Sequence, residues 1–217
     1  MTILITGAAR GIGRGLRDAY LAQGQEVIGT CRGPAPDHGA WLSLDVRDPA
    51  AHREMALALG GQPLSLLVCN AGIYPDKGQR LGDGFAATDW ADAFAVNVTG
   101  VFLTVQALLP NLRAARGRIA IIASAMGSDT RAPGGSYIYR ASKAAALNLG
   151  RNLATDLKPD GIAVGIYHPG WVRTDMGGAA AEIDLETATA GLIARFEELA
   201  PDTTGRFLAY DGTPVPF

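Results

Sequence analysis

The chain has few of the residues that metal sites and disulfide frameworks require. It contains two cysteines and three histidines in 217 residues, with no Cys-x-x-Cys motif and no His–Cys cluster. We therefore expect Cys31 and Cys69 to be small core residues rather than metal ligands or a redox pair. The formal net charge of −2 offers no basic excess, so we expect neither nucleic acid nor an acidic membrane surface as a partner.

Long apolar segments are also lacking. We find no run of about 18 apolar residues that would span a bilayer, and a first strand at Thr2 leaves no room for a signal peptide. These absences favour a cytoplasmic protein. With 217 residues, 48% of them hydrophobic, the chain is long enough for one well-buried domain and short for two, so we expect a single domain over residues 1–217.

Short apolar runs alternate along the chain with segments of helical spacing. The expected strands cover 3–5, 27–31, 64–69, 119–123, 162–167 and 207–209, with a further one at 40–44. The expected helices cover 12–23, 49–59, 88–115, 139–157 and 185–199. Continuous apolar runs are typical of strands buried on both faces of a parallel sheet. The pattern predicts an α/β protein with a three-layer, doubly wound Rossmann fold: a mostly parallel, seven-stranded sheet with helices on both faces.

Two loops and one helix stand out by composition. Residues 72–88 and 169–184 are rich in Gly and Ala and follow the carboxyl ends of predicted strands, where ligands of such sheets bind. The predicted helix 88–115 carries more apolar side chains than one side of a sheet needs. A second subunit would cover the excess, and a deeply buried helix is the alternative.

A glycine-rich turn joins the first predicted strand to the first helix, with the sequence TGAARGIG at 6–13. Glycines let the backbone approach a pyrophosphate, and the N-terminus of the following helix offers free N–H groups and a partial positive charge. The position of the turn in an alternating chain predicts a dinucleotide site. Its candidate residues here are Gly7, Ala9, Arg10, Gly11, Ile12 and Gly13.

The end of the second predicted strand indicates which dinucleotide binds. Residues 27–31 are followed by Arg32 instead of the acidic residue that would accept hydrogen bonds from the ribose 2′-hydroxyl of NAD. Arg32 and Arg10 together could hold a 2′-phosphate, because a guanidinium pairs with phosphate through two hydrogen bonds. We predict that NADP(H) is preferred over NAD(H). The alternative is that either arginine is a solvated loop charge.

A Tyr-x-x-x-Lys pair lies at 139–143 on a predicted helix. Residues four apart share a helix face, so the Tyr139 phenol and the Lys143 ammonium would meet at one site. A free tyrosine has a pKa of about 10, and a neighbouring cation stabilises its phenolate. Such a pair is common on solvent-exposed helix faces. When it follows the fifth predicted strand of a chain that also has this glycine turn, it indicates a catalytic acid–base pair.

Together these motifs resemble those of the short-chain dehydrogenase/reductase family over essentially the whole chain. The Gly-x-x-x-Gly-x-Gly spacing, the Asn-Ala-Gly turn at 70–72 and the Tyr-x-x-x-Lys pair occur in the family's order. The resemblance implies an NAD(P)-dependent oxidoreductase that moves a hydride between the nicotinamide and a small carbonyl or alcohol. It also implies that Tyr139 is the general acid in reduction and the general base in oxidation, and that Lys143 assists it and binds the nicotinamide ribose.

Two further catalytic residues are implied by the resemblance. Ser124, directly after the strand 119–123, corresponds to the serine that hydrogen-bonds the substrate oxygen and stabilises charge there. Asn97 corresponds to the asparagine that holds a water in the proton relay through Lys143. The alternative for Asn97 is an ordinary polar residue that kinks the helix.

The spacing of the serine differs from the family's pattern. Ser124 precedes Tyr139 by fifteen positions rather than the usual thirteen. Ser128 and Ser136 are therefore alternative candidates for the catalytic serine. Tyr137 is a poorer acid than Tyr139, because it has no lysine four residues later. We expect His168 to be a structural residue.

The resemblance also assigns cofactor contacts at other strand ends. It implies an acidic residue on the adenine, an Asn-Ala-Gly turn beside the adenosine ribose, and a Pro-Gly turn that leads to a threonine on the nicotinamide carboxamide. In this chain the residues are Asp45, Val46, Asn70, Ala71, Gly72, Pro169, Gly170, Val172 and Thr174. Cys69 stands where many members have another asparagine.

Segments such as 126–128 and 170–176 look like the small-chain branch that includes C-factor and sniffer-type carbonyl reductases. The branch implies a homodimer or homotetramer formed through the helices around 88–115 and 139–157. The short segment after the sixth strand favours a shallow pocket for small carbonyl compounds. Because the branch includes signalling proteins, a dinucleotide-binding regulatory protein is the alternative. An epimerase or dehydratase would normally need an added substrate domain, and fold analogy does not name the substrate.

Overall fold

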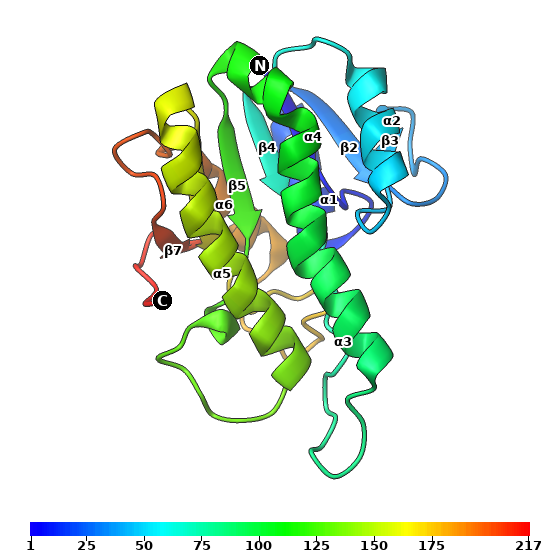
Figure 1. Ribbon diagram of the computed structural model, residues 1–217, viewed down its shortest axis with the longest axis vertical. Helices are drawn as coiled ribbons and strands as arrows, with labels where there is room; N and C mark the ends of the chain where they lie inside the picture. The colour runs from blue at the N-terminus through cyan, green and yellow to red at the C-terminus, as the bar shows by residue number, and fades with distance from the viewer.

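The computed structural model describes residues 1–217 and contains a seven-stranded sheet with helices on both faces (Figure 1). The strands are β1 (Thr2–Ile5), β2 (Glu26–Cys31), β3 (Ala40–Ser43), β4 (Leu66–Cys69), β5 (Arg118–Ile122), β6 (Ala163–His168) and β7 (Phe207–Ala209). All neighbouring strands are parallel, in the order β3-β2-β1-β4-β5-β6-β7. The three-layer Rossmann fold predicted from the sequence is confirmed.

The helices divide between the two faces of the sheet. One face is covered by α1 (Gly11–Ala22) and α6 (Leu185–Glu197). The other is covered by α2 (Pro49–Leu59), α4 (Gly100–Ala115) and α5 (Tyr137–Leu157), which lie in front of the sheet in Figure 1. The short α3 (Ala87–Phe94) leads into α4. Four of the five predicted helices are present with ends within two residues of those expected, and the predicted helix 88–115 is divided between α3 and α4.

Alternate residues of each strand enter two separate cores. Ile3 and Ile5 of β1 pack in the same cluster as Leu16 of α1, whereas Leu4 packs in the cluster that contains Leu108 of α4. Successive strand side chains point to opposite faces, and here both faces are covered. This is why the strands read as continuous apolar runs rather than as an alternation of apolar and polar residues.

The helical stretch Ala87–Ala115 is strongly apolar. By length and composition it could cross a membrane, with a mean hydropathy of 1.6 over 18 residues, which corrects our expectation that no segment could. In the fold, Val101, Val105 and Leu108 of this stretch are buried against the sheet. Their burial accounts for much of the apolar composition.

A π-helical turn, Ala95–Thr99, interrupts this stretch between α3 and α4. We predicted one helix over 88–115, and the periodicity gave no sign of the turn. A π turn inserts one extra residue and is common at functional sites. The π turn contains Asn97. The residue that we expected either to be catalytic or to distort the helix therefore lies in an irregular part of the helix.

Both cysteines are free and buried, as the sequence indicated. Cys31 Sγ lies 3.1 Å from the Gly33 carbonyl oxygen. Burial raises the pKa of Cys69 to about 12, so its thiol stays protonated at neutral pH.

Candidate active site

The predicted site residues gather at the carboxyl edge of the sheet. Thr6 follows β1, Asn70 follows β4, Ser124 follows β5 and Pro169 follows β6. In an open parallel sheet this edge forms the ligand crevice. In Figure 1 it is the end toward which the arrowheads of β4 and β5 point.

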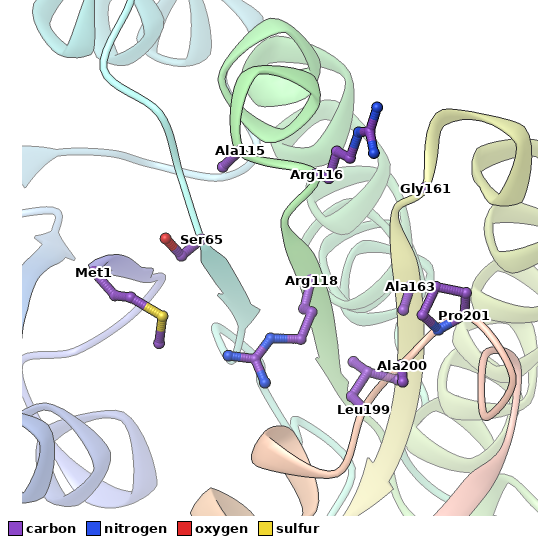
Figure 2. A pocket seen from close by; sticks show the side chains of 10 residues that line it. All are labelled: Met1, Ser65, Ala115, Arg116, Arg118, Gly161, Ala163, Leu199, Ala200 and Pro201. Carbon is purple, nitrogen blue, oxygen red and sulfur yellow. The ribbon is translucent and has the colours of Figure 1, made fainter.

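A hollow of about 300 Å³ lies at the opposite edge of the sheet (Figure 2). Its lining includes Ser65, Arg118 and Ala163, which stand at the amino-terminal ends of β4, β5 and β6. None of the predicted catalytic or cofactor-binding residues lines it. The hollow is therefore separate from the candidate active site.

The glycine turn has the shape that a dinucleotide phosphate requires. Gly7 and Gly11 have positive φ angles of 65° and 55°, which residues with a Cβ rarely adopt. A Cβ on Gly13 would clash with the Asn70 amide and the Gly7 carbonyl oxygen. Helix α1 begins at Gly11 without a side-chain cap, so its first N–H groups remain available for a phosphate. The turn fits the pyrophosphate of NAD(P).

The side chain of Asn70 stabilises the glycine turn through hydrogen bonds. Its side-chain Nδ2 donates to the carbonyl oxygens of Thr6 (2.9 Å) and Gly7 (3.2 Å). Thr6 Oγ1 in turn accepts hydrogen bonds from the backbone N–H groups of Asn70 (3.0 Å) and Ala71 (3.1 Å). The Asn-Ala-Gly turn thus fixes the path of the glycine turn, a function that the sequence motif did not reveal.

The two arginines predicted to hold a 2′-phosphate have different surroundings. Arg10 Nη1 lies 3.3 Å from Asp175 Oδ2, and both side chains are exposed. Arg32 is exposed at the end of β2 and makes no ion pair. Arg10 is therefore paired with a carboxylate, whereas Arg32 has no ion-pair partner.

Asp45, the predicted adenine contact, is engaged by its own loop. Arg47 Nη2 lies 2.8 Å from Asp45 Oδ2. This hydrogen bond lowers the pKa of Asp45 to about 2, and the charge of Arg32 acts in the same direction. The neighbouring Val46 is buried, and a Cβ on Gly100 of α4 would contact it.

Tyr139 and Lys143 lie one turn apart on α5, both buried. Lys143 Nζ is 5.6 Å from the centroid of the Tyr139 ring and donates a hydrogen bond to the Ile122 carbonyl oxygen (2.9 Å). Burial lowers the pKa of Lys143 to about 8. The pair therefore places an ammonium group beside a phenol near neutral pH.

Among the three candidate serines, Ser124 is the one that influences the pKa of Tyr139. Burial raises the pKa of Tyr139 to about 12, while hydrogen bonding to Ser124 lowers it. The Ser128 hydroxyl pairs with Thr130 Oγ1 (2.9 Å), and the Ser136 hydroxyl pairs with the Tyr74 hydroxyl. Ser124 Oγ also accepts a hydrogen bond from the backbone N–H of Met126 (3.1 Å), which fixes its side chain at the end of β5.

Asn97 ties the π turn to the neighbouring loop and to α5. Its Oδ1 accepts from the Ile73 N–H (2.9 Å), and its Nδ2 donates to the Ile73 carbonyl oxygen (2.9 Å) and to Ser142 Oγ (2.9 Å). A Cβ on Gly72 would lie 3.3 Å from Asn97 Oδ1 and 3.6 Å from Lys143 Nζ. The glycine therefore keeps the space between these two groups open.

The loop after β6 faces the glycine turn. A Cβ on Gly11 would lie 3.7 Å from Thr174 Cγ2, and Thr174 Oγ1 accepts a hydrogen bond from the Gly177 N–H (3.2 Å). Gly170, after Pro169, has a φ of 86°. Val172 is buried and forms a parallel bridge with Ile183. The Pro-Gly turn and Thr174 thus border the space in front of the glycine turn.

His168 and Tyr137 are the two side chains that the sequence analysis set aside. Burial lowers the pKa of His168 to about 4, so its ring is neutral at physiological pH. Tyr137 is partly exposed and meets the Phe85 ring edge-on at 5.2 Å. Neither takes part in the Tyr139 hydrogen bonds.

A polar cluster formed by Arg17, Asp37 and Trp41 was not predicted from the sequence. The guanidinium of Arg17, almost fully buried, makes two hydrogen bonds of 3.0 Å to Asp37 and stacks over the Trp41 ring at 4.3 Å. Trp41 Nε1 also donates to Asp37 Oδ1 (2.9 Å). These bonds fix the loop that follows Arg32. The sequence did contain a signal for this cluster, because Arg17 lies on the apolar face of the predicted helix 12–23.

Comparison with known proteins agrees with this geometry. Residues 1–184 match the family model described as short chain dehydrogenase. The chain belongs to the short-chain dehydrogenase/reductase family. It is 40% identical over 157 residues to C-signal of Myxococcus xanthus, covering 71% of this chain and 93% of the relative.

Solved structures of the same family are similar over their full lengths. The carbonyl reductase Sniffer of D. melanogaster superposes with a TM-score of 0.92 and 32% identity, covering 100% of this chain and 99% of that one. An NADPH-bound carbonyl reductase from chicken fatty liver gives a TM-score of 0.90 and 29% identity, covering 100% and 98%. The chain is an NAD(P)-dependent oxidoreductase of the C-factor and sniffer-like branch of the family.

Proposed function

We propose that this protein is an NADP(H)-dependent reductase of small carbonyl compounds, with Ser124, Tyr139, Lys143 and Asn97 as its catalytic residues. The observation that carries the proposal is the burial of Tyr139 and Lys143 side by side on α5, next to Ser124 and at the sheet edge that holds the glycine turn. A buried phenol with a high pKa is protonated at neutral pH. To act as an acid it also needs its phenolate stabilised, and the Lys143 ammonium beside the ring would provide this.

The protein's part in the reaction is to orient the carbonyl and supply a proton. NADPH, when bound, supplies the hydride that reduces the carbonyl carbon. Ser124 donates a hydrogen bond to the carbonyl oxygen, and Tyr139 transfers its phenolic proton to the same oxygen as the C=O bond becomes a single bond. Lys143 stabilises the phenolate that remains. Asn97 holds a water in the space beside Gly72, from which Lys143 and then Tyr139 recover a proton.

The cofactor would lie between the glycine turn and the loop after β6. Gly7, Ala9, Gly11, Ile12 and Gly13 would take the pyrophosphate. We propose that Arg32, free of any ion pair, takes the 2′-phosphate, and that Arg10 contributes after leaving Asp175.

The remaining cofactor contacts would come from the other strand ends. The NADPH bound to the chicken carbonyl reductase supports the choice of cofactor. The proposed contacts are Asp45 and Val46 on the adenine, Asn70, Ala71 and Gly72 beside the adenosine ribose, Tyr139 and Lys143 at the nicotinamide ribose, and Pro169, Gly170, Val172 and Thr174 at the nicotinamide.

The assembly and location are part of the same proposal. We expect one NAD(P)-binding domain over residues 1–217 in a cytoplasmic homodimer or homotetramer formed through α4 and α5. Phe102 of α4 supports this arrangement, because 41% of its surface is exposed on the monomer.

A second candidate function is a dinucleotide-binding regulatory protein with incidental turnover. The similarity to C-signal supports this regulatory function as an alternative. It predicts tight NADPH binding without a substrate that turns over, whereas the reductase predicts turnover that depends on Tyr139.

NADPH and NADH oxidation by the purified protein against aldehydes, ketones, quinones and 3-oxoacyl esters tests the proposal. Turnover with NADPH that falls by a factor of about 10³ or more in Tyr139→Phe is the expected result. The cofactor Kd of the variant, measured by nicotinamide fluorescence, should stay close to that of the wild type. Tight NADPH binding with no turnover of any carbonyl would favour the regulatory function.

A further inference from the structure

Helix α5 carries the proposed acid–base pair but does not cap its own N-terminus. Ser136, which precedes the helix, has a left-handed backbone (φ 49°, ψ 43°) and makes no capping hydrogen bond. Its hydroxyl instead pairs with the Tyr74 hydroxyl. Tyr139 lies in the first turn of α5, where helices fray and the N–H groups have no partner within the helix. Another part of the chain must hold this turn.

Asp76 supplies the missing cap from the loop between β4 and α3. Its Oδ2 accepts a hydrogen bond from the Ile138 N–H (2.8 Å), and its Oδ1 accepts one from the Tyr139 N–H (3.2 Å). The residue has no solvent-exposed surface. A carboxylate at a helix N-terminus is favoured by the helix dipole, and hydrogen bonds to a charged acceptor are stronger than neutral ones. Both carboxylate oxygens are thus committed to the turn that contains Tyr139.

Neighbours of Asp76 tie the same loop to the rest of the site. The Tyr74 ring stacks on the Tyr139 ring, and Lys77 Nζ donates to the carbonyl oxygens of Met176 (2.9 Å) and Gly177 (3.2 Å) in the loop after β6. In Figure 1 this segment extends beyond the carboxyl edge of the sheet, next to α3. Asp76 is the buried, charged anchor among these contacts, and it is the one that reaches the backbone of α5.

We infer that Asp76 is a positioning residue that holds Tyr139 at the correct place for proton transfer. The inference rests on the proposed function, because it assigns Tyr139 as the acid. Asp76 is fully buried with both carboxylate oxygens bonded to the α5 backbone, so its loss should lower kcat and leave KM and cofactor affinity nearly unchanged. A displacement of about 1 Å at a reacting group can reduce a rate about a hundredfold.

Asp76→Asn and Asp76→Ala test this inference, with Asp48→Asn as the matched control. Asp48 is the exposed N-cap residue of α2 and accepts a hydrogen bond from the Ala50 N–H (2.8 Å), so it controls for the loss of a helix-capping carboxylate away from the site. For each protein kcat, KM, the NADPH Kd, the Tm and amide hydrogen exchange would be measured. We expect Asp76→Asn to lower kcat about tenfold to a hundredfold, with KM and Kd within about twofold of wild type.

Hydrogen exchange separates the inference from the proposed function. Amides of the first turn of α5 should exchange about tenfold or more faster in Asp76→Asn, while Asp48→Asn should affect α2 alone. Unchanged exchange in that turn, or a kcat loss no greater than in Asp48→Asn at a similar Tm, would overturn the inference. If the wild type turns over no carbonyl, the proposed function fails, and the exchange data still decide whether Asp76 holds Tyr139.

Discussion

The Tyr74 ring lies parallel to the Tyr139 ring, with the centroids 4.2 Å apart and the planes inclined by 17°. Tyr74 therefore covers one face of the proposed proton donor. Together with burial, this neighbour contributes to the high pKa of Tyr139. The stack comes from a loop rather than from a strand or a helix, so the loop itself completes the site.

Replacing Tyr74 should separate the effect of the ring from that of its hydroxyl. Tyr74→Phe keeps the stack and loses the hydrogen bond to Ser136, so we expect a kcat within about threefold of the wild type. Tyr74→Ala removes a stacked pair worth about 0.5–1.5 kcal/mol and exposes Tyr139 to water, so kcat should fall about tenfold. Steady-state kinetics of both variants provide the measurement. A similar loss in both would point to the hydroxyl instead.

The two buried pKa values predict how carbonyl reduction depends on pH. Reduction needs the proton of Tyr139, whose pKa is about 12, and the charge of Lys143, whose pKa is about 8. As pH rises, Lys143 therefore loses its charge before Tyr139 loses its proton. Because these are pKa values of the free protein, we expect kcat/KM to be level below about pH 8 and to fall about tenfold per pH unit above it. NADPH oxidation followed from about pH 6 to about pH 10 gives the profile.

Lys143→Arg is the control for this profile. Arginine keeps its charge at every pH in the range, so the decline above pH 8 should disappear even where the overall rate is lower. A decline that persists unchanged in Lys143→Arg would assign the titration to another group.

Local patterns in the sequence predicted the fold and singled out residues that lie together at the carboxyl edge of the sheet. Two covered faces make each strand a continuous apolar run, and the glycine turn and the Tyr-x-x-x-Lys pair are each contained within a few residues. Long-range polar contacts were not predictable in this way. Asp76 and Ile138 are 62 positions apart, and Asn97 and Ser142 are 45 apart. No local pattern indicates which backbone or side-chain group such a residue will meet.

The π turn and the arginines illustrate the same limit. The period of the apolar residues in 88–115 is that of a helix. It does not reveal the π turn, at which Asn97 accepts a hydrogen bond from the Ile73 N–H and donates one to Ser142 Oγ. Arg10 and Arg32 both fit a 2′-phosphate by charge. Their different surroundings depend on Asp175, which is distant in the sequence.

Arg32 should control the choice of cofactor more strongly than Arg10. Arg32→Asp removes a phosphate partner and places an acidic residue where it can bind a ribose 2′-hydroxyl. We expect the NADPH Kd to rise about a hundredfold and the NADH Kd to change little or to fall. Arg10→Ala should raise the NADPH Kd less, because Arg10 must first leave Asp175. Nicotinamide fluorescence titrations with both cofactors are the measurement, and an equal loss for NADPH and NADH in Arg32→Asp would exclude a 2′-phosphate contact.

Gly72→Ala tests whether the space between Asn97 and Lys143 is needed for proton recovery. The new methyl group would lie 3.3 Å from Asn97 Oδ1 and 3.6 Å from Lys143 Nζ, so Asn97 would have to shift by a few tenths of an ångström and the room for a water would be lost. We expect kcat to fall about tenfold with little change in KM or Tm. Gly61→Ala is the matched control, since nothing lies within 4 Å of its added Cβ and it is remote from the site. A Gly72→Ala enzyme with the kcat of the wild type would mean that protons reach Lys143 by another route.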